Sequence, residues 1–219
     1  TITMAPLVVK GKVLVGNSGG EMGVRGWLTA LDATNGKIAW RAYSTGPDED
    51  VLIGDDFKPF YDSDKGKDLG VKTWPPGRWE IGGGTVWGWI SYDPDLDLIY
   101  YGTSNPGPWN HNQRPGDNKW SMTIFARDID TGEAKWVYQM TPHDEWDYDG
   151  VNEMILTEQE IHYQVWQLTR RLAPEELADA IRRNKKEYVE TASGFIDLVT
   201  TRVSTPLATK SGNTWAWPM

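Results

Sequence analysis

The feature that most constrains the fold is an internal repeat of the form A-x-D-x-x-x-G-x-x-x-W, which occurs at residues 30–40 and again at residues 126–136. Each copy lies within two short apolar runs separated by a turn signal, such as Asn35-Gly36 in the first copy. A repeated strand–turn–strand unit that ends in a large aromatic residue is typical of β-propeller blades, in which a Trp packs between neighbouring sheets. A plain antiparallel meander with ordinary turns is the alternative.

The repeat is preceded in both places by another apolar strand pattern, at residues 7–16 and at residues 96–105. The first of these is a hairpin signal, with Lys10-Gly11-Lys12 between two apolar runs. The same two patterns in the same order predict two similar antiparallel units, with long insertions between their strands. The 13 tryptophans, far more than an ordinary globular chain carries, agree with a repeated packing unit. We expect a mainly β fold with about two propeller blades.

The composition changes sharply near Leu156, which predicts a domain boundary there. Residues 1–156 carry 23 acidic and 14 basic side chains, whereas residues 157–219 carry eight of each. Residues 157–203 show apolar side chains at helical spacing and a capping-box pattern at Thr157 and Glu160, so we expect a helical segment of unknown role. Residues 204–219 are turn-rich, and we expect them to form a flexible tail.

The net charge of −9 argues against a nucleic-acid partner, which would require a basic face. No apolar run approaches membrane-spanning length, so no membrane span is expected. The chain has no Cys, which excludes a disulfide framework and a thiolate metal site. It opens on Thr1 without a signal-peptide pattern, which suggests a mature or truncated piece.

The candidate functional residues lie in four loops that follow predicted strands. These loops are residues 16–26 with Glu21, residues 82–89 with Thr85 and Trp87, residues 102–110 with Asn105, and residues 143–152 with Asp147 and Asp149. Taken singly, each loop has an ordinary explanation as a turn or a solvated acidic segment. Together they supply carboxylate and amide oxygens, which suit hard cations such as Ca²⁺ rather than zinc or copper.

A second possible calcium-binding pattern, at residues 93–98, does not match the EF-hand loop in full. It begins like an EF-hand loop with Asp93, Asp95 and Asp97. The sixth position is Leu98 rather than Gly, and the twelfth is Ser104 rather than Glu. We therefore expect a turn between strands here.

Residues 1–156 resemble an internal section of the large subunit of the pyrroloquinoline quinone (PQQ) dehydrogenases of the methanol/ethanol family. The resemblance is carried by several long motifs in the family's order. They are APLVVKGKV, GGEMGVRG, GGTVWGW, NPGPWN, RPGDNKW, DTGEAKW and HDEWDYDGVN. It implies about two blades of an eight-bladed quinoprotein propeller.

The resemblance also implies a role for each candidate residue. Glu21 and Asn105 resemble ligands of the active-site metal, and Asp147 resembles the general base and a metal-site carboxylate. Trp87 resembles the indole that stacks on the PQQ ring. The positions that match those binding the cofactor's carboxylates or lining its pocket are Thr3, Ser18, Gly19, Gly20 and Thr85.

Asp149 separates two branches of this family. Calcium-dependent methanol dehydrogenases carry a small residue two positions after the catalytic aspartate, whereas the lanthanide-dependent branch carries Asp. The extra carboxylate favours a larger coordination number and a trivalent ion, so the segment DYDG resembles the lanthanide version. Ca²⁺ is the alternative metal. A second alternative is that Asp149 is only a solvated charge in the loop.

The implied activity is oxidation of a small primary alcohol such as methanol, with electrons passed to a periplasmic c-type cytochrome. The family's vicinal disulfide and several of its PQQ contacts lie outside the matching section. A homo-oligomer or a partner chain completing the propeller would remove the open sheet edges that two blades leave. The alternative function is a catalytically inactive propeller fragment or fusion that acts as an interaction module through its helical tail.

Overall fold

The computed structural model describes residues 1–156 and the backbone of residues 209–211 and 214–216. Residues 1–156 form one compact unit. The two later strands, β9 (Thr209–Ser211) and β10 (Thr214–Ala216), pair with each other as an antiparallel hairpin. The predicted helical segment 157–203, the interaction role assigned to it, and most of the predicted tail 204–219 lie outside the described residues.

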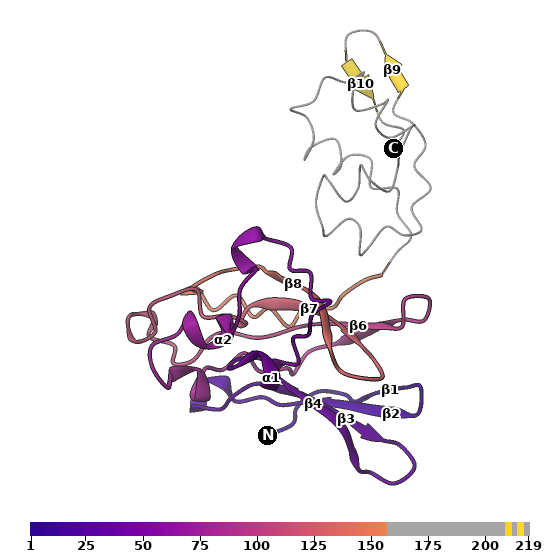
Figure 1. Ribbon diagram of the computed structural model, residues 1–219, viewed down its shortest axis with the longest axis horizontal. Coiled ribbons are helices and arrows are strands. Elements are labelled where there is room, and N and C mark those ends of the chain that lie inside the picture. The colour runs from indigo at the N-terminus through magenta and orange to yellow at the C-terminus, as the bar shows by residue number, and fades with distance from the viewer. Residues whose placement is uncertain (157–208, 212–213, 217–219) are drawn as a thin grey trace. The chain divides into compact units, whose positions relative to one another are not determined.

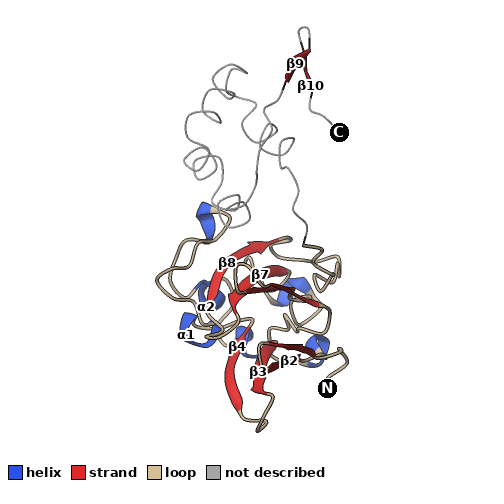
Figure 2. Ribbon diagram, turned by 90° about the vertical axis from the view of Figure 1, so that its right-hand side faces the viewer, coloured by secondary structure: helices blue, strands red, loops and turns tan. Residues whose placement is uncertain are grey.

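The unit consists of two four-stranded antiparallel sheets, each with its strands in chain order. Figure 1 shows β1–β4 in indigo and violet below β6–β8 in pink and orange, and the turned view in Figure 2 keeps the two sheets stacked. The first sheet comprises β1 (Leu7–Val9), β2 (Lys12–Gly16), β3 (Trp27–Asp32) and β4 (Ile38–Tyr43). The second comprises β5 (Ile90–Asp93), β6 (Leu98–Gly102), β7 (Thr123–Asp128) and β8 (Ala134–Gln139). The mainly β prediction is confirmed, as are the predicted hairpins.

The strand register explains the sequence repeat. Ala30 lies directly opposite Trp40, and Ala126 lies directly opposite Trp136. A small residue in that place leaves room for the indole of its cross-strand neighbour. In both copies the register shifts by a β-bulge immediately after the alanine, so the two halves of the repeat fold alike.

The first repeat's Trp holds the two sheets together. The Trp40 indole Nε1 donates to the carbonyl of Ile129, 3.0 Å away in the turn between β7 and β8. The ring packs beside Gly132 in the same turn. The predicted packing of a Trp between neighbouring sheets is therefore present. The core that surrounds it includes Leu14, Leu28, Val51, Ile99, Tyr101, Trp120, Phe125 and Val137.

Gly36 and Gly132 occupy the same place in the repeat and both have positive φ, 71° and 77°. A Cβ on Gly36 would meet nothing within 4 Å, whereas a Cβ on Gly132 would lie 2.5 Å from Cδ2 of Trp40. We expect Gly36→Ala to lower the free energy of unfolding by about 1 kcal/mol through left-handed strain. Gly132→Ala adds a clash with the indole, worth roughly a further 1–3 kcal/mol. Urea unfolding of both variants checks this, and equal losses would contradict it.

An ion-pair network links turns of the two sheets. Lys10 in the β1–β2 turn lies 3.0 Å from Asp97 and 2.9 Å from Asp130, which belong to turns of the second sheet. Asp93 accepts hydrogen bonds from the backbone N–H groups of Asp95 and Leu96. The acidic segment at 93–98 is thus a turn between β5 and β6, as predicted, rather than a calcium loop.

The insertions between strands form short helical turns. Those after β4 are α1 (Asp48–Val51), a 3₁₀ turn (Asp62–Asp64), α2 (Leu69–Lys72) and a 3₁₀ turn (Arg78–Ile81). Two more 3₁₀ turns lie at Gly20–Met22 and His111–Gln113. Across the part of the chain that is described, no helix is long and apolar enough to cross a membrane.

Candidate functional site

Three of the four predicted loops meet beyond one end of the sheets. The first follows the end of β2 and another follows the end of β6. The backbone N–H of Gly26 donates to the carbonyl of Gly83 at 2.7 Å, and the N–H of Gly84 donates to the carbonyl of Asn105 at 2.9 Å. The N–H of Gly107 donates to Gly82 at 2.9 Å. The loops 16–26, 82–89 and 102–110 are therefore joined by main-chain hydrogen bonds.

The fourth loop crosses the end of β6 at a glycine. Gly102 faces the carbonyl of Gly150 so closely that a Cβ would clash with it. Because only glycine permits this approach, residue 102 sets how near the acidic loop can lie to the others. The four loops are therefore brought together by main-chain hydrogen bonds and by the close approach of Gly102 to Gly150.

Glu21 lies in a 3₁₀ turn whose loop is closed at its base by Asn17. The Asn17 side chain is buried, accepts from the N–H of Trp27 at 2.9 Å, and donates to the carbonyl of Arg25 at 3.0 Å. Glycines in the left-handed region flank the turn on both sides, Gly19 with φ 94° and Gly23 with φ 72°. The Glu21 residue itself is exposed, so its carboxylate is available to a ligand.

The centre of the site is the buried Asn105 side chain, which holds two carboxylates. Its Nδ2 donates to Oδ1 of Asp147 and, at 2.9 Å, to Oδ1 of Asp149. Its Oδ1 accepts from the backbone N–H of Asp149 at 2.9 Å. Both aspartates have positive φ, 64° and 54°, an uncommon conformation that turns their side chains toward the same amide.

The electrostatics of this group favour a cation. Burial raises the pKa of the Asp149 carboxyl, and the negative charges of Asp147 and Glu21 raise it further, while the hydrogen bond from Asn105 opposes the shift. The charge of Glu21 therefore acts on the same place as the two aspartates. Negative charges crowded in this way are stabilised by a positive ion among them.

The carboxylates lie in neighbouring loops, but their spacing is not that of a complete set of metal ligands. Within residues 1–156, no three Asp, Glu or His side chains lie at the spacing of a metal site. The structure brings Asn105, Asp147 and Asp149 into direct contact, whereas Glu21 acts on Asp149 through its charge. The oxygen-only donor set fits a hard cation, and the Asn105 carbonyl has a second lone pair available beside its bond to Asp149.

Of the residues predicted to hold the cofactor, Gly20 and Thr85 lie together beside the Asn105 loop. A Cβ on Gly20 would lie 3.4 Å from Oγ1 of Thr85, and that hydroxyl is 2.7 Å from Oγ of Ser104. Ser18 is instead bonded to the carbonyl of Thr1, by its N–H at 2.9 Å and its hydroxyl at 3.2 Å. Gly20 and Thr85 are thus placed beside the loop that carries Asn105.

The other cofactor candidates are less constrained. Thr3 is exposed, and Gly19 and Trp87 are half-buried. Among the described residues, no hydrogen bond joins Thr3 or Trp87 to the Asn105 group. Their predicted roles stay predictions.

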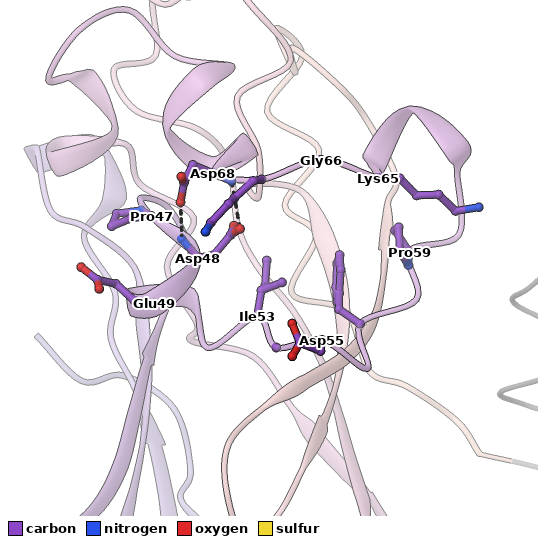
Figure 3. A pocket seen from close by; sticks show the side chains of 12 residues that line it. Pro47, Asp48, Glu49, Ile53, Asp55, Pro59, Lys65, Gly66 and Asp68 are labelled. Carbon is purple, nitrogen blue, oxygen red and sulfur yellow. Dashed lines mark hydrogen bonds between the residues drawn. The ribbon is translucent and has the colours of Figure 1, made fainter.

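A surface cavity of about 780 Å³ lies elsewhere, in the insertion that follows β4. Figure 3 shows Asp48 and Asp68 on one wall, each accepting a hydrogen bond from the backbone N–H of the other, at 3.1 and 2.9 Å. No candidate residue lines it. Its lining consists of Pro47, Asp48, Glu49, Ile53, Gly54, Asp55, Phe57, Pro59, Lys65, Gly66, Lys67 and Asp68.

Sequence reasoning missed the residues that support the site rather than form it. Asn17, Ser104 and Arg114 are all buried and all bond to the candidate loops. Ser104 is adjacent to the candidate Asn105, and Asn17 is adjacent to the candidate Ser18. A search for polar residues next to the candidates would therefore have found both. Nothing in the sequence marks Arg114, since its role depends on contacts between distant segments.

Comparison with known proteins gives matches over the same section of the chain. A PQQ family model, described as glucose/ethanol/alcohol dehydrogenase, β-propeller domain, matches residues 1–168. The lanthanide-dependent methanol dehydrogenase of Methylacidiphilum fumariolicum is 66% identical over 157 residues, which are 71% of this chain and 26% of that protein. Methanol dehydrogenase (cytochrome c) subunit 1 of Methylorubrum extorquens is 61% identical over 162 residues, 73% of this chain and 25% of that protein.

The fold matches solved structures as well. A europium-containing methanol dehydrogenase superimposes with a TM-score of 0.70 at 63% identity, over 73% of this chain and 28% of that one. The two sheets are therefore blades of a partial β-propeller, as predicted. The chain spans about a quarter of the length of the curated relatives it matches.

Proposed function

This chain belongs to the PQQ glucose/ethanol/alcohol dehydrogenase β-propeller family, and from that membership we propose that it carries the metal-binding part of a PQQ-dependent alcohol dehydrogenase. The reaction is oxidation of a primary alcohol to the aldehyde. The chain includes the four loops that hold the candidate metal and cofactor residues, so the proposal can be tested on it directly.

The observation that carries the proposal is the Asn105 amide with its two carboxylates. Asn105 lies at the end of one propeller strand, and Asp147 and Asp149 lie in a loop about forty residues later, yet one amide bonds to both. A solvated acidic loop would not need a buried amide to hold it, nor left-handed backbone at both aspartates. We propose that Glu21, Asn105, Asp147 and Asp149 supply the oxygens of one cation site.

A bound metal ion would supply a Lewis acid, and bound PQQ would supply the hydride acceptor. Asp147 is the general base and accepts the hydroxyl proton of the alcohol at its carboxylate. Asp147 is suited to this role because it is exposed and its Oδ1 is oriented by Asn105. Trp87 would hold the flat cofactor by stacking, and its pocket would be lined by Thr85, Gly20, Gly19, Ser18 and Thr3.

We propose a lanthanide ion as the metal, with Ca²⁺ as the alternative. Asp149 supplies a third carboxylate beside those of Glu21 and Asp147, and a trivalent ion balances three negative charges. The names of two relatives, a lanthanide-dependent and a europium-containing methanol dehydrogenase, agree with this choice. A methanol-like substrate, a c-type cytochrome as electron acceptor and a periplasmic location complete the proposal, the first two supported by the relatives' names.

The test is binding followed by turnover. We expect the folded chain to bind PQQ and La³⁺ in equal amounts, with quenching of Trp fluorescence. Each of the two should bind more weakly when the other is omitted. Dye-linked methanol oxidation by the loaded protein then measures the activity. Folded protein that binds neither PQQ nor La³⁺ would contradict the proposal, because the donor set would not form a site.

A further inference from the structure

A buried arginine joins the two loops on which the proposed cation site is built. Arg114 is 1% exposed. Its Nε donates to the carbonyl of Pro108 at 2.7 Å, and its Nη2 donates to the carbonyl of Asp144 at 2.6 Å. Pro108 belongs to the loop of Asn105, and Asp144 begins the acidic stretch that leads to Asp147. One guanidinium therefore bonds to both loops at once.

The geometry requires arginine. Nη1 of Arg114 donates to Oδ1 of Asn118 at 3.0 Å, and Nη2 also donates to the carbonyl of Trp109 at 3.4 Å. A planar guanidinium presents five N–H donors in a fixed fork, whereas a lysine ammonium is a compact point charge on a flexible stem. Lysine at residue 114 could keep a positive charge but could not reach both loops with the same directed bonds.

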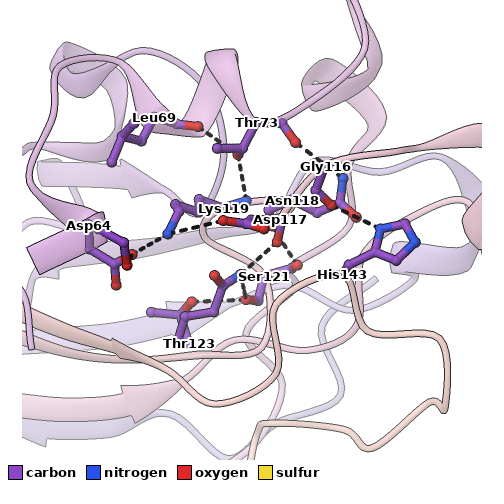
Figure 4. Close-up of polar contacts among 12 residues, drawn as sticks. Asp64, Leu69, Thr73, Gly116, Asp117, Asn118, Lys119, Ser121, Thr123 and His143 are labelled. Carbon is purple, nitrogen blue, oxygen red and sulfur yellow. Dashed lines mark hydrogen bonds and ion pairs between the residues drawn. The ribbon is translucent and has the colours of Figure 1, made fainter. Parts of the chain in front are cut away.

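The segment that carries Arg114 is itself fixed to the rest of the unit. Figure 4 shows the N–H of Asn118 bonded to the carbonyl of Thr73, at 3.1 Å, and the His143 ring beside the carbonyl of Gly116, with Nδ1 at 2.9 Å. The backbone N–H of His143 also donates to the backbone carbonyl of Asp117, at 3.1 Å. His143 is the first residue of the acidic loop, so this segment holds that loop at two points in addition to Asp144.

The charges around Arg114 allow it to stay buried. Burial lowers the pKa of the guanidinium, and the negative charges of Asp144 and Glu145 oppose that shift. A buried cation with its donors bonded to carbonyls and acids nearby is a fixed structural element, and removing it leaves buried carbonyls without partners.

We infer that Arg114 is a positioning residue, which holds the Asn105 loop in register with the Asp147–Asp149 loop so that the amide meets both carboxylates. The inference extends the proposed function, since the same register sets the spacing of the cation's oxygens. Its direct consequence can be measured without any ion. The N–H of Asp149 donates to Oδ1 of Asn105 across the two loops, so its exchange with solvent reports their register.

The test compares two conservative variants of the full chain. Arg127 is the matched control, since it is also fully buried and its Nη1 donates to the carbonyls of Val51 at 2.7 Å and Gly132 at 2.9 Å. We expect Arg114→Lys to speed hydrogen exchange of the Asp149 amide, followed by NMR without metal, by about tenfold or more through local opening. Arg127→Lys should leave that amide's exchange unchanged.

Unchanged exchange at Asp149 in Arg114→Lys, or equal acceleration in both variants, would overturn the inference. If Arg114→Lys does not fold, the unaltered chain still decides. The Nε–H of Arg114 should then exchange far more slowly than that of a solvated arginine, and exchange at the solvent rate would overturn the inference.

Titration with Tb³⁺ separates this inference from the proposed function. We expect Arg114→Lys to bind Tb³⁺ about 10–100-fold more weakly than the unaltered chain, the usual effect of losing a group that orients metal ligands. Arg127→Lys should bind Tb³⁺ as the unaltered chain does. An unaltered chain that shows the exchange effect but binds no Tb³⁺ would leave the positioning role standing and contradict the cation site.

Discussion

Replacing Asp149 by alanine is expected to shift the preference of the site from La³⁺ toward Ca²⁺ by about 100-fold, which corresponds to about 2.7 kcal/mol. In the proposed cation site, the carboxylate of Asp149 is one of three negative charges, beside those of Glu21 and Asp147. A trivalent ion loses more attraction than a divalent ion when one such charge is removed. At an effective dielectric constant of 20, each unit of charge at 4 Å is worth about 4 kcal/mol, and desolvation offsets part of the difference.

The mutual repulsion of the carboxylates reduces the loss of affinity for both ions. The pKa of Asp149 is raised by burial and by the charges of Asp147 and Glu21. The alanine variant therefore removes repulsion as well as attraction, and the overall affinity falls less than the Coulomb term alone. The difference in binding free energy between the two ions is not reduced in this way. Both ions bind to the same metal-free protein, so the repulsion cancels in the difference.

Competition between Tb³⁺ and Ca²⁺, followed by Trp-sensitised luminescence, measures the shift. Asp130→Ala is the matched control, because it makes the same change of charge in the β7–β8 turn, where Asp130 bonds to Lys10 and Lys12. We expect the control to keep the preference of the unaltered chain. An unchanged preference in Asp149→Ala would show that Asp149 is a solvated loop charge.

Replacing Lys119 by methionine is expected to destabilise the chain by about 3–5 kcal/mol, the usual cost of leaving a buried charge without its partner. Lys119 Nζ pairs with Oδ1 of Asp64, and the two side chains are 4% and 2% exposed. Figure 4 shows this pair within the buried polar network, with Asp117 on the other side of the ammonium at 3.7 Å. The variant leaves the carboxylate of Asp64 buried without a cation.

The double variant Asp64→Leu/Lys119→Met tests the cause. With both charges removed, the unfolding free energy is expected to recover most of the loss, since a buried ion pair is often no more stabilising than apolar side chains of similar size. Urea unfolding of the two variants gives the comparison. A loss below about 1 kcal/mol in the single variant, the range of exposed ion pairs, would show that the pair is solvated.

The repeat predicted the blades because its residues act on their own neighbourhood. Ala30 and Ala126 make room for Trp40 and Trp136 across one pair of strands, and the bulge after each alanine recurs in both copies. Such local pairing leaves a pattern of fixed spacing in the sequence. The repeat predicted that a Trp packs between the two sheets. It could not identify Ile129 as the partner of Trp40, because the two residues lie 89 positions apart.

The sequence pointed to the proposed ligands of the cation but not to the residues that support their loops. Glu21, Asn105, Asp147 and Asp149 stand in motifs that follow strands, so both chemistry and resemblance pointed to them. Arg114 acts through main-chain carbonyls of Pro108 and Asp144, and carbonyls carry no side-chain signal in the sequence. Residues whose partners are backbone atoms of distant loops are found only when the loops can be seen together.

Anomalous diffraction from crystals of the full chain grown with La³⁺ locates the ion relative to the four proposed ligands. We expect one strong peak with oxygens of Glu21, Asn105, Asp147 and Asp149 all near it, at about 2.6 Å or slightly more, the upper end of Ca²⁺–oxygen distances. No peak among these side chains, or a peak only in the acidic cavity beside Asp48 and Asp68, would show that these four residues do not form a cation site.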